Sequence, residues 1–181
     1  QGNGQPTEPY LLTAVDASGT PYGEEVQLGN QCAGDFDWPW GQHACMKLDN
    51  DNILLYDNGV NRQFQQPSTN HSRAVEYSIN EENMTVTQVW QYGKERGNEF
   101  HSFIVSDVDV LDNGNRLITS GTVNYNNLHY AKITEVSYPD NMETFEATVY
   151  FQDELGSDEG GWGDFDLIYR SEKLPLYPKI D

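Results

Sequence analysis

The side chains of this chain best suited to chemistry are its four histidines and an arginine that follows a predicted strand. His43 stands just ahead of the apolar segment "ACMKL", and Arg62 comes three residues after the "DNG" at 57–59. A neutral imidazole nitrogen is a competent nucleophile and can carry a proton near neutral pH. The planar guanidinium of arginine can hold two oxygens of an anion. Each also has a structural alternative, which is packing for His43 and an ordinary ion pair for Arg62.

The other three histidines lie in different surroundings. His101 is flanked by phenylalanines in "EFHSF", so packing and nucleophilic catalysis are both open to it. His71 lies in the polar segment "QQPSTNHSR", where we expect a solvated surface residue. His129, in "NYNNLHYAK", begins an outer strand, and we expect a structural role for it.

Two cysteines, Cys32 and Cys45, bound the segment "CAGDFDWPWGQHAC". A disulfide between them would contribute roughly 3 kcal/mol in the chain-entropy model, and two free thiols are the alternative. As a zinc pair they are poorly spaced, because neither a CxxC motif nor a second thiol pair accompanies them. The turns "DNDN" and "DNGN" lack the ligand spacing of a calcium loop. The sequence therefore predicts no metal site.

The overall charge narrows the range of partners. The 181 residues include 29 acidic and 10 basic side chains, for a net charge of -19. Such a field repels nucleic acid and anionic lipid surfaces. No apolar run approaches the ~18 to 20 residues that a membrane helix needs, and the beginning, "QGNGQPTEPY", does not have the pattern of a signal peptide. We expect one domain, no nucleic-acid partner and no membrane insertion, in a secreted or salt-adapted protein.

Short alternating segments bounded by Gly, Asn, Asp and Pro dominate the chain, and helical periodicity is almost absent. The connecting segments "LDNDN", "LDNGN" and "YPDNM" are predicted to be tight turns. The predicted fold class is all-β. The expected strands are Tyr10–Asp16, Glu25–Leu28, His43–Leu48, Asn52–Tyr56, Arg73–Asn80, Thr85–Tyr92, Ser102–Leu111, Arg116–Ser120, Ala131–Ser137, Thr144–Gln152 and Phe165–Arg170.

An internal repeat organises these strands. "MKLDNDNILLYDNG" at 46–59 matches "DVLDNGNRLITSG" at 109–121, with Leu48 and Leu111 equivalent and a period of 63 residues. Each copy is followed by two further strands, so each unit is a blade of four antiparallel strands, as in a β-propeller. We expect a single β-propeller segment, residues 1–181, composed of the outer hairpin of a preceding blade (10–30), two blades (41–93 and 99–152), and a closing strand and tail (162–181).

The number of blades is too small for closure. About three blades are fewer than the roughly four to eight with which propellers close. Such an incomplete propeller would leave sheet edges open at both ends. We therefore expect the remaining blades to come from a longer or cleaved chain, with a ring of several copies, a homo-oligomer, as the alternative.

The segment "WPWGQHACMKLDNDNILLYDNGVNR" resembles the arylsulfate sulfotransferases, which are six-bladed propeller enzymes. Three features carry the resemblance: a histidine that opens an inner strand, the Leu-Asp-Asn turn, and a "DNG" followed three residues later by arginine. The second repeat, "NEFHSFIVSDVDVLDNGNRLITSG", resembles the next blade of that family. The resemblance covers roughly residues 10–172, so this chain resembles the C-terminal part of the family.

The resemblance implies nucleotide-independent sulfuryl transfer from an aryl sulfate to a phenolic acceptor through a sulfated histidine, in a secreted or periplasmic protein without a cofactor. It makes His101 the nucleophile, Arg62 a clamp on the sulfate, and His43 an acid/base or oxyanion donor. A histidine that titrates near neutral pH suits protonation of a departing phenolate. The further substrate-binding residues expected are Trp38, Trp40, Asn58 and Asn61. For the two tryptophans, packing is the alternative to an aromatic wall for the phenol.

Two features depart from the family pattern. Several relatives have an asparagine two residues after the first histidine, where this chain has Cys45. A further family histidine belongs to an earlier blade, outside these residues. The competing interpretation is therefore a non-catalytic secreted propeller that serves as a binding or assembly module.

Overall fold

The computed structural model describes residues 11–64, 71–151 and 166–175, and strands dominate them. The helical elements there are short: one α-helix of four residues and two 3-10 helices. The prediction of an all-β fold is confirmed. In chain order the elements are β1 (Thr13–Ala14), α1 (Glu24–Gln27), β2 (Gln42–Lys47), β3 (Ile53–Asp57), η1 (Arg62–Phe64), β4 (Arg73–Asn80), β5 (Thr85–Tyr92), η2 (Lys94–Glu99), β6 (Asp107–Val110), β7 (Arg116–Tyr125), β8 (Leu128–Val136) and β9 (Glu143–Tyr150).

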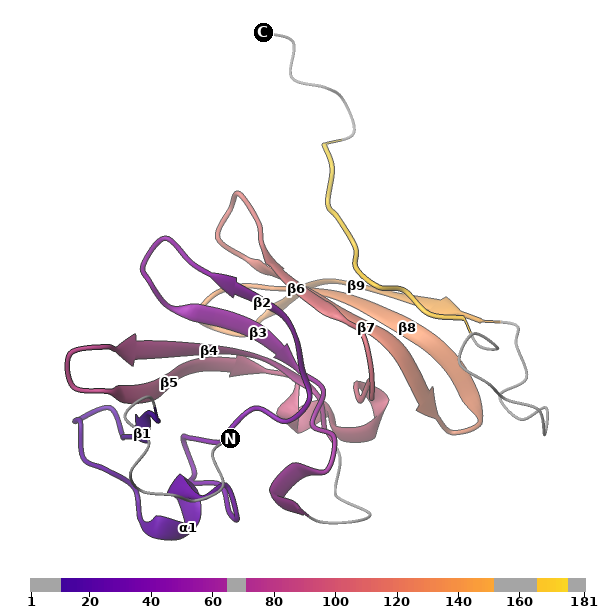
Figure 1. Ribbon diagram of the computed structural model, residues 1–181. Coiled ribbons are helices and arrows are strands. Elements are labelled where there is room, and N and C mark those ends of the chain that lie inside the picture. The colour runs from indigo at the N-terminus through magenta and orange to yellow at the C-terminus, as the bar shows by residue number, and fades with distance from the viewer. Residues whose placement is uncertain (1–10, 65–70, 152–165, 176–181) are drawn as a thin grey trace, which may run out of the picture.

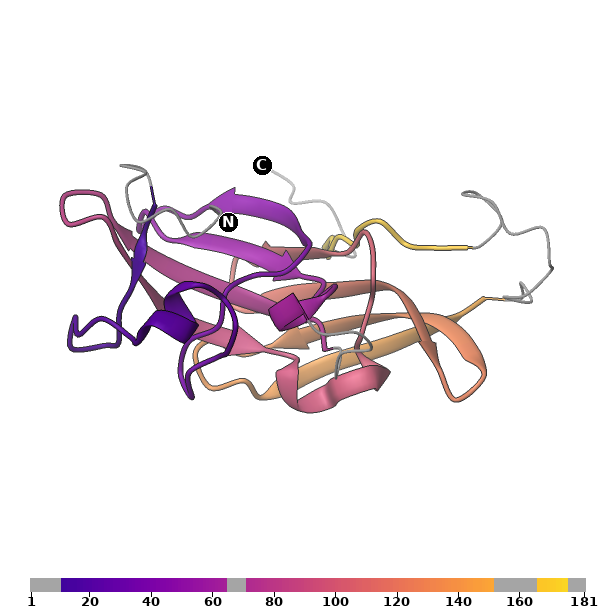
Figure 2. The same ribbon diagram turned by 60° about the horizontal axis from the view of Figure 1, so that its bottom comes forward.

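The strands form two open sheets. The first has the order β1-β5-β4-β3-β2 and the second the order β6-β7-β8-β9. Four strands of each sheet are antiparallel, as expected of a propeller blade, while β1 joins the outer edge of the first sheet in parallel to β5. The inner strand β6 contacts β2 and β3, and from this junction both sheets spread outward (Figures 1 and 2). The described residues are thus an incomplete, propeller-like fold.

The two sheets pack on each other through one shared core. In β3, Leu54 and Tyr56 point toward the second sheet, which contributes Val108 and Ile118 to the same cluster. Leu55, between them, points to the opposite face, because successive side chains of a strand alternate. There it belongs to a second cluster that includes residues of β1, α1 and the following loop. The side chains of the apolar run "ILLY" are therefore packed into apolar clusters on both faces of the sheet.

A hydrogen-bonded turn explains the repeat in the first sheet. Asn50 accepts from the backbone N–H of Asn52, which fixes the predicted tight turn between β2 and β3. The Asn52 amide donates to Glu76 Oε1 at 2.7 Å. The other carboxylate oxygen of Glu76 accepts from Arg116 of the second sheet at 3.0 Å. This buried glutamate therefore connects its own turn to the neighbouring sheet. We call this arrangement of Asn52, Glu76 and Arg116 a glutamate joint.

The second sheet has an equivalent glutamate joint, in which the cation is a lysine. Asn113 accepts from the Asn115 N–H, and the Asn115 amide donates to Glu135 Oε1 at 2.7 Å. Lys173, from the C-terminal segment, donates to Glu135 Oε2 at 2.5 Å. The lysine thus has the place at Glu135 that Arg116 has at the equivalent glutamate of the first sheet.

The segment 166–175 runs over the outer face of the second sheet (Figure 1). Its backbone meets Gly121, whose carbonyl accepts from the Ile168 N–H at 2.9 Å. A Cβ at position 121 would lie 2.0 Å from the Ile168 carbonyl oxygen, so this approach requires glycine. Further along, the hydroxyls of Thr119 and Ser171 are hydrogen-bonded at 2.5 Å. The segment is therefore seated by backbone and side-chain contacts.

Several expected strands differ from the structure. The strand expected at Glu25–Leu28 is wrong: Glu24–Gln27 is helical, with two acidic residues in its first turn, where the helix dipole favours them. The strand expected from Ser102 begins only at Asp107, because Val105 and Ser106 have positive φ values of 52° and 88°. Residues 166–170 form no strand, and Phe165 lies outside the described residues.

The N-terminal segment also departs from expectation. The strand expected at Tyr10–Asp16 is limited to Thr13–Ala14, and Tyr10 lies outside the described residues. Cys32 is half-buried and Cys45 is exposed, and both are free thiols. A disulfide between these two residues stays a prediction.

Candidate functional site

His43 and Asn58 meet at the inner end of the first sheet. His43 pairs with Tyr56 across β2 and β3, and Asn58 follows two residues later on the same face. The His43 Nδ1 and Asn58 Oδ1 atoms are 2.8 Å apart. The Asn58 amide is fully buried and donates to the carbonyls of Ser102 at 2.6 Å and Val105 at 3.1 Å. Asn58 therefore ties His43 to the segment that leads into the second sheet.

His101 reaches the same cluster through Ser72. The His101 Nδ1 and Ser72 Oγ atoms are 3.1 Å apart. Ser72 is fully buried, and its hydroxyl donates to the Asn58 carbonyl at 2.9 Å while accepting from the Ser102 N–H at 2.9 Å. Burial and the nearby Arg62 charge lower the pKa of His101, which favours its neutral form. The structure thus brings together His43, Asn58 and His101.

Arg62 lies behind this cluster in a buried ion-pair network. Its Nη1 donates to Asp37 at 2.6 Å and its Nη2 to Asp57 at 2.9 Å. Arg73 donates from Nε to the same Asp57 oxygen at 2.9 Å. All four side chains are buried. Two arginines and two aspartates therefore form a charge-balanced support under the histidines.

The "DNG" segment shapes this support. Asp57 Oδ1 accepts from the N–H groups of Trp40 at 2.7 Å and Gly59 at 3.0 Å. Gly59 has a φ of +76°, and a Cβ there would lie 2.1 Å from the His71 carbonyl oxygen. Only glycine fits between the aspartate turn and the chain that carries Ser72.

The other expected substrate-binding residues are not part of the cluster. Trp38 donates from its indole to the Val26 carbonyl at 2.8 Å and packs edge-on against Phe36. Trp40 is buried, with its ring edge-on to Phe64 at 4.9 Å. Asn61 is exposed and has a positive φ of 56°. Packing is therefore what the structure shows for both tryptophans.

Two further histidines have structural surroundings. The expectation that His71 is a solvated surface residue is wrong, because its side chain is half-buried and its Nε2 atom is enclosed in the protein. Burial and then the charges of Arg62 and Arg73 lower its pKa to about 3. His129 is buried in β8, with Nε2 2.8 Å from the Thr122 hydroxyl and its ring against Phe151. Its expected structural role agrees with this packing.

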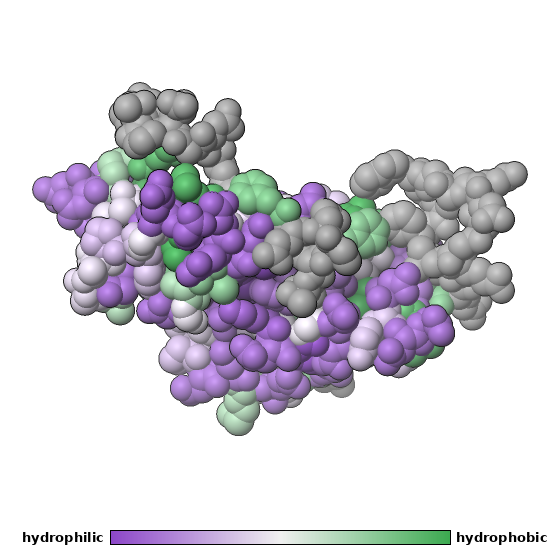
Figure 3. Space-filling view, turned by 90° about the horizontal axis from the view of Figure 1, so that it is seen from below, coloured by the Kyte–Doolittle hydropathy of each residue, from purple (hydrophilic) through white to green (hydrophobic). Residues whose placement is uncertain are grey.

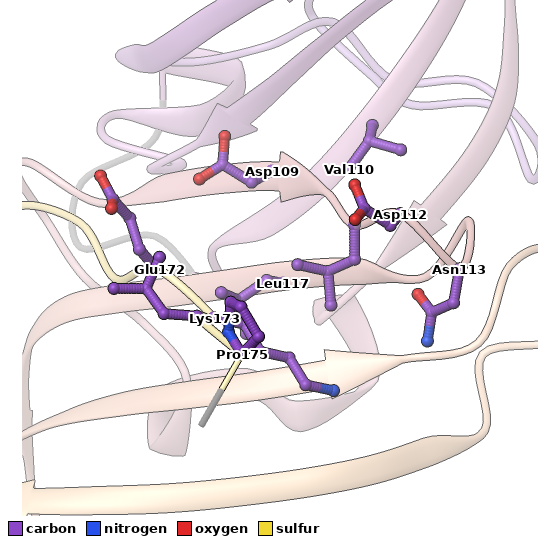
Figure 4. Close-up of a pocket in the computed structure, with 10 residues that line it drawn as sticks. Asp109, Val110, Asp112, Asn113, Leu117, Glu172, Lys173 and Pro175 are labelled. Atoms are coloured by element: carbon purple, nitrogen blue, oxygen red, sulfur yellow. The ribbon is translucent and has the colours of Figure 1, made fainter. Parts of the chain in front are cut away.

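A groove on the second sheet lies apart from the histidines. It is formed where the turn after β6 meets the C-terminal segment, and its walls include Asp109, Asp112, Glu172 and Lys173 (Figure 4). Three acids against one lysine make it a poor place for an anion. None of the clustered histidines lines it.

Neither a metal site nor a membrane span is found in the part of the chain that the structure describes. There, no three or more His, Cys, Asp and Glu side chains are grouped so that they could hold a metal ion. Across the described ranges 11–64, 71–151 and 166–175, no helix has both the length and the apolar character needed to cross a membrane. The surface seen from below is mostly hydrophilic, with hydrophobic residues in small separate groups (Figure 3).

Sequence reasoning missed the residues that hold the histidines in place. Ser72, Arg73 and Asp37 carry this role, and none belongs to the repeated segment. The only signal was indirect: Asp37 and the "HSR" at 71–73 are polar residues beside buried strands. Asp57 was part of the "DNG" motif, although its role as a double acceptor for arginine was not foreseen.

Two open, blade-like sheets with a histidine cluster at their junction define the class as an incomplete propeller-like protein. The family model described as "Arylsulfotransferase (ASST)" matches residues 1–156, and the chain belongs to this family. It is similar to "Arylsulfate sulfotransferase AssT" of Lelliottia amnigena, with 36% identity in an alignment of 136 residues that covers 71% of this chain and 22% of that protein.

A second relative has the same name and comes from Escherichia coli O6:H1 strain CFT073. It is 36% identical in an alignment of 121 residues that covers 65% of this chain and 20% of that protein. The resemblance seen in the sequence is thereby confirmed at the level of the family. The chain spans about a fifth of the length of these curated relatives.

Proposed function

We propose that this chain is part of an enzyme that transfers a sulfuryl group from an aryl sulfate to a phenolic acceptor, without a nucleotide donor. The observation that carries the proposal is the convergence of His43 and His101 on Asn58 and Ser72, in a member of the arylsulfotransferase family. The two relatives described above are named arylsulfate sulfotransferases, which supports the same substrate class.

The chemistry assigned to the cluster is a two-step transfer. A ring nitrogen of neutral His101 attacks sulfur, so that an S–N bond forms as the S–O bond to the departing phenolate breaks. His43, as its imidazolium, gives the phenolate a proton and becomes neutral. In the second step neutral His43 takes the proton of the acceptor phenol, whose oxygen attacks sulfur and releases His101. Protons and bonds therefore balance over one cycle.

Arg62 is assigned a supporting role in place of the sulfate clamp expected from the sequence. Its Nη1 and Nη2 atoms already donate to Asp37 and Asp57, both of which are buried. Moving the guanidinium to a substrate would leave two buried carboxylates short of a partner, which is costly. Its charge nonetheless acts on the site, because it helps to keep His101 neutral.

The rest of the propeller is assigned to a longer chain that carries these residues, with a homo-oligomer as the alternative. The short fraction of the relatives that is matched and the open sheets support this assignment. We also assign the protein to a secreted or periplasmic location, for which the acidic composition is the supporting observation.

The direct test is incubation of the complete protein with p-nitrophenyl sulfate and a phenol acceptor. We expect release of nitrophenol and formation of the sulfated acceptor, and we expect both to be abolished by His101→Asn. His129→Gln, a histidine change outside the cluster, is the matched control and should keep activity. If the complete protein releases no nitrophenol, or if His101→Asn is as active as wild type, the proposal is wrong.

A non-catalytic binding module is the second candidate, favoured by Cys45 at the position where relatives have an amide. Binding to a glycan array or capture of a partner by a protein that is inert toward aryl sulfates would support it. The Cys45 side chain is exposed and lies on the same strand as His43. Cys45→Asn should raise sulfuryl transfer if the missing amide matters to an active enzyme.

A further inference from the structure

We propose that Asn58 and Ser72 are positioning residues that hold both His43 and His101 with the hydrogen on Nδ1, so that each ring presents a lone pair at Nε2. The catalytic meaning of this inference rests on the proposed function. The positions of the hydrogens themselves can be measured without any activity, so the two proposals can fail separately.

The argument for His43 starts from the orientation of the Asn58 amide. Two acceptors that cannot donate, the carbonyl oxygens of Ser102 and Val105, lie 2.6 Å and 3.1 Å from one end of that amide. Only the NH2 group can serve them, so the amide oxygen must face His43. An amide oxygen is an acceptor only. The hydrogen in the 2.8 Å contact therefore belongs to His43 Nδ1.

The argument for His101 uses the single hydrogen of the Ser72 hydroxyl. Two carbonyl oxygens lie within its reach, Asn58 O at 2.9 Å and Ser102 O at 3.1 Å. The hydroxyl hydrogen goes to one of these acceptors, which leaves two lone pairs on the oxygen. The Ser102 N–H takes one of them, and the ring nitrogen of His101 faces the other. His101 Nδ1 therefore carries the hydrogen in that contact.

One connected hydrogen-bond network, with members from both sides of the junction between the sheets, thus orients both histidines. Asn58 follows β3, while Ser102 and Val105 lie in the segment before β6. Asn58, Ser72 and Ser102 are fully buried, so water does not compete for their hydrogen bonds. Val105 has a positive φ of 52°, a conformation that is uncommon for a β-branched residue. This backbone presents its carbonyl to the Asn58 amide.

The shared hydrogen position suits a two-histidine transfer. The nucleophile needs a free lone pair, and a ring that donates from Nδ1 has that lone pair on Nε2. The acid/base residue needs a nitrogen that can gain and lose a proton while its ring stays in place. Asn58 Oδ1 can accept from His43 Nδ1 in both of its charge states, so proton transfer at Nε2 leaves this bond unchanged.

The test is ¹⁵N NMR of the complete protein, in which long-range ¹H–¹⁵N couplings distinguish the two neutral forms of each histidine. Signals are assigned by loss in His43→Gln and His101→Gln. We expect Nδ1–H for both rings in wild type. Asn58→Leu should abolish this preference at His43, and Ser72→Ala should abolish it at His101. Asn58→Asp, which keeps an acceptor oxygen, should retain Nδ1–H at His43, and Ser72→Thr should retain it at His101.

Thr119→Val is the matched control, because it removes a buried hydroxyl on the opposite face of the second sheet. It should change neither histidine. In kinetics, Asn58→Leu and Ser72→Ala should lower kcat by roughly 10²- to 10⁴-fold, the contribution typical of a correctly positioned acid or base, with KM little changed. Nε2–H on either ring in wild type, or unchanged forms in both variants, would overturn the inference. If both rings carry Nδ1–H in a protein inert toward aryl sulfates, only the proposed function fails.

Discussion

Each of the two sheets has a glutamate joint of the same kind, but the sheets carry different groups at their inner ends. In each, an asparagine turn holds a buried glutamate that also binds a cation. In the first sheet the inner end holds His43 and buried ion pairs. In the second, 63 residues later, Asp57 is replaced by Ser120 and Asn58 by Gly121. The repeat therefore preserves the scaffold and leaves the inner end free to differ.

The difference at one pair of positions shows how each sheet uses the same location. Asn58 fills its position with an amide that joins the histidine to the next sheet. At Gly121 the space of a side chain is taken by the Ile168 carbonyl of the C-terminal segment. A position that holds a histidine in place in the first sheet thus accommodates chain packing in the second. Substitutions at equivalent positions of the two sheets test this contrast, and we expect their effects on stability to differ in size.

The largest effect is expected from Asp57→Ala, compared with Ser120→Ala. Asp57 is fully buried and serves both Arg62 and Arg73, so its loss leaves two buried charges short of a partner. We expect a loss of roughly 3–5 kcal/mol in the free energy of unfolding. Ser120→Ala removes one hydrogen bond with Tyr56 and should cost about 1 kcal/mol. Urea unfolding measures both, and equal losses would contradict the contrast.

A smaller difference is expected between the two glutamate joints. Glu76→Gln weakens a buried pair with Arg116, whose side chain is 6% exposed, and should cost about 3 kcal/mol. Glu135→Gln weakens a pair with Lys173, whose side chain is 53% exposed, and should cost at most about 1 kcal/mol. The measurement is again the free energy of unfolding in urea. A loss for Glu135→Gln that equals or exceeds the loss for Glu76→Gln would contradict the expected effect of burial.

The pH dependence of the free energy of unfolding should report on Asp107, in the inner strand β6 of the second sheet. Burial and the neighbouring Asp109 raise the pKa of Asp107 to about 6, while the unfolded value is 3.8. The folded state therefore binds more protons than the unfolded state between these values, so stability falls as pH rises from about 4 to 6. Asp107→Asn should flatten this part of the curve. Thermal unfolding at a series of pH values tests it, and an unchanged slope would contradict the assignment.

The smallest effect concerns His71, beside the ion-pair network of the first sheet. Because its pKa is lowered to about 3, the ring stays neutral across the physiological range. Its NMR signals should not shift between pH 5 and 8. A titration of His71 within that range would mean that its ring is more open to water than the structure shows.

Much of the scaffold was predictable from the sequence, because it rests on local chemistry. The turns "LDNDN" and "LDNGN" specify hairpins through side-chain hydrogen bonds two residues apart. The family resemblance, and not the period, placed His43 and His101 at the beginnings of neighbouring units. Asn58 was expected to bind substrate, whereas it is buried with hydrogen bonds at both ends of its amide.

The remaining features depend on contacts between distant segments. Asp37 meets Arg62 across a loop, and Ser72 meets His101 across the sheet junction. No periodicity marks such residues, because each acts alone and at one place in the fold. The helix at Glu24–Gln27 was missed for a related reason: four residues are too few to show a helical period.

The balanced charges beneath the histidines affect how an anion reaches them. Arg62 and Arg73 are matched by Asp37 and Asp57, so this network adds no net attraction, while these 181 residues carry a charge of -19. A sulfate ester of the proposed kind would approach against that field. Added salt shortens the range of such repulsion. Its association rate should therefore rise with ionic strength, the opposite of the salt effect in electrostatically steered enzymes.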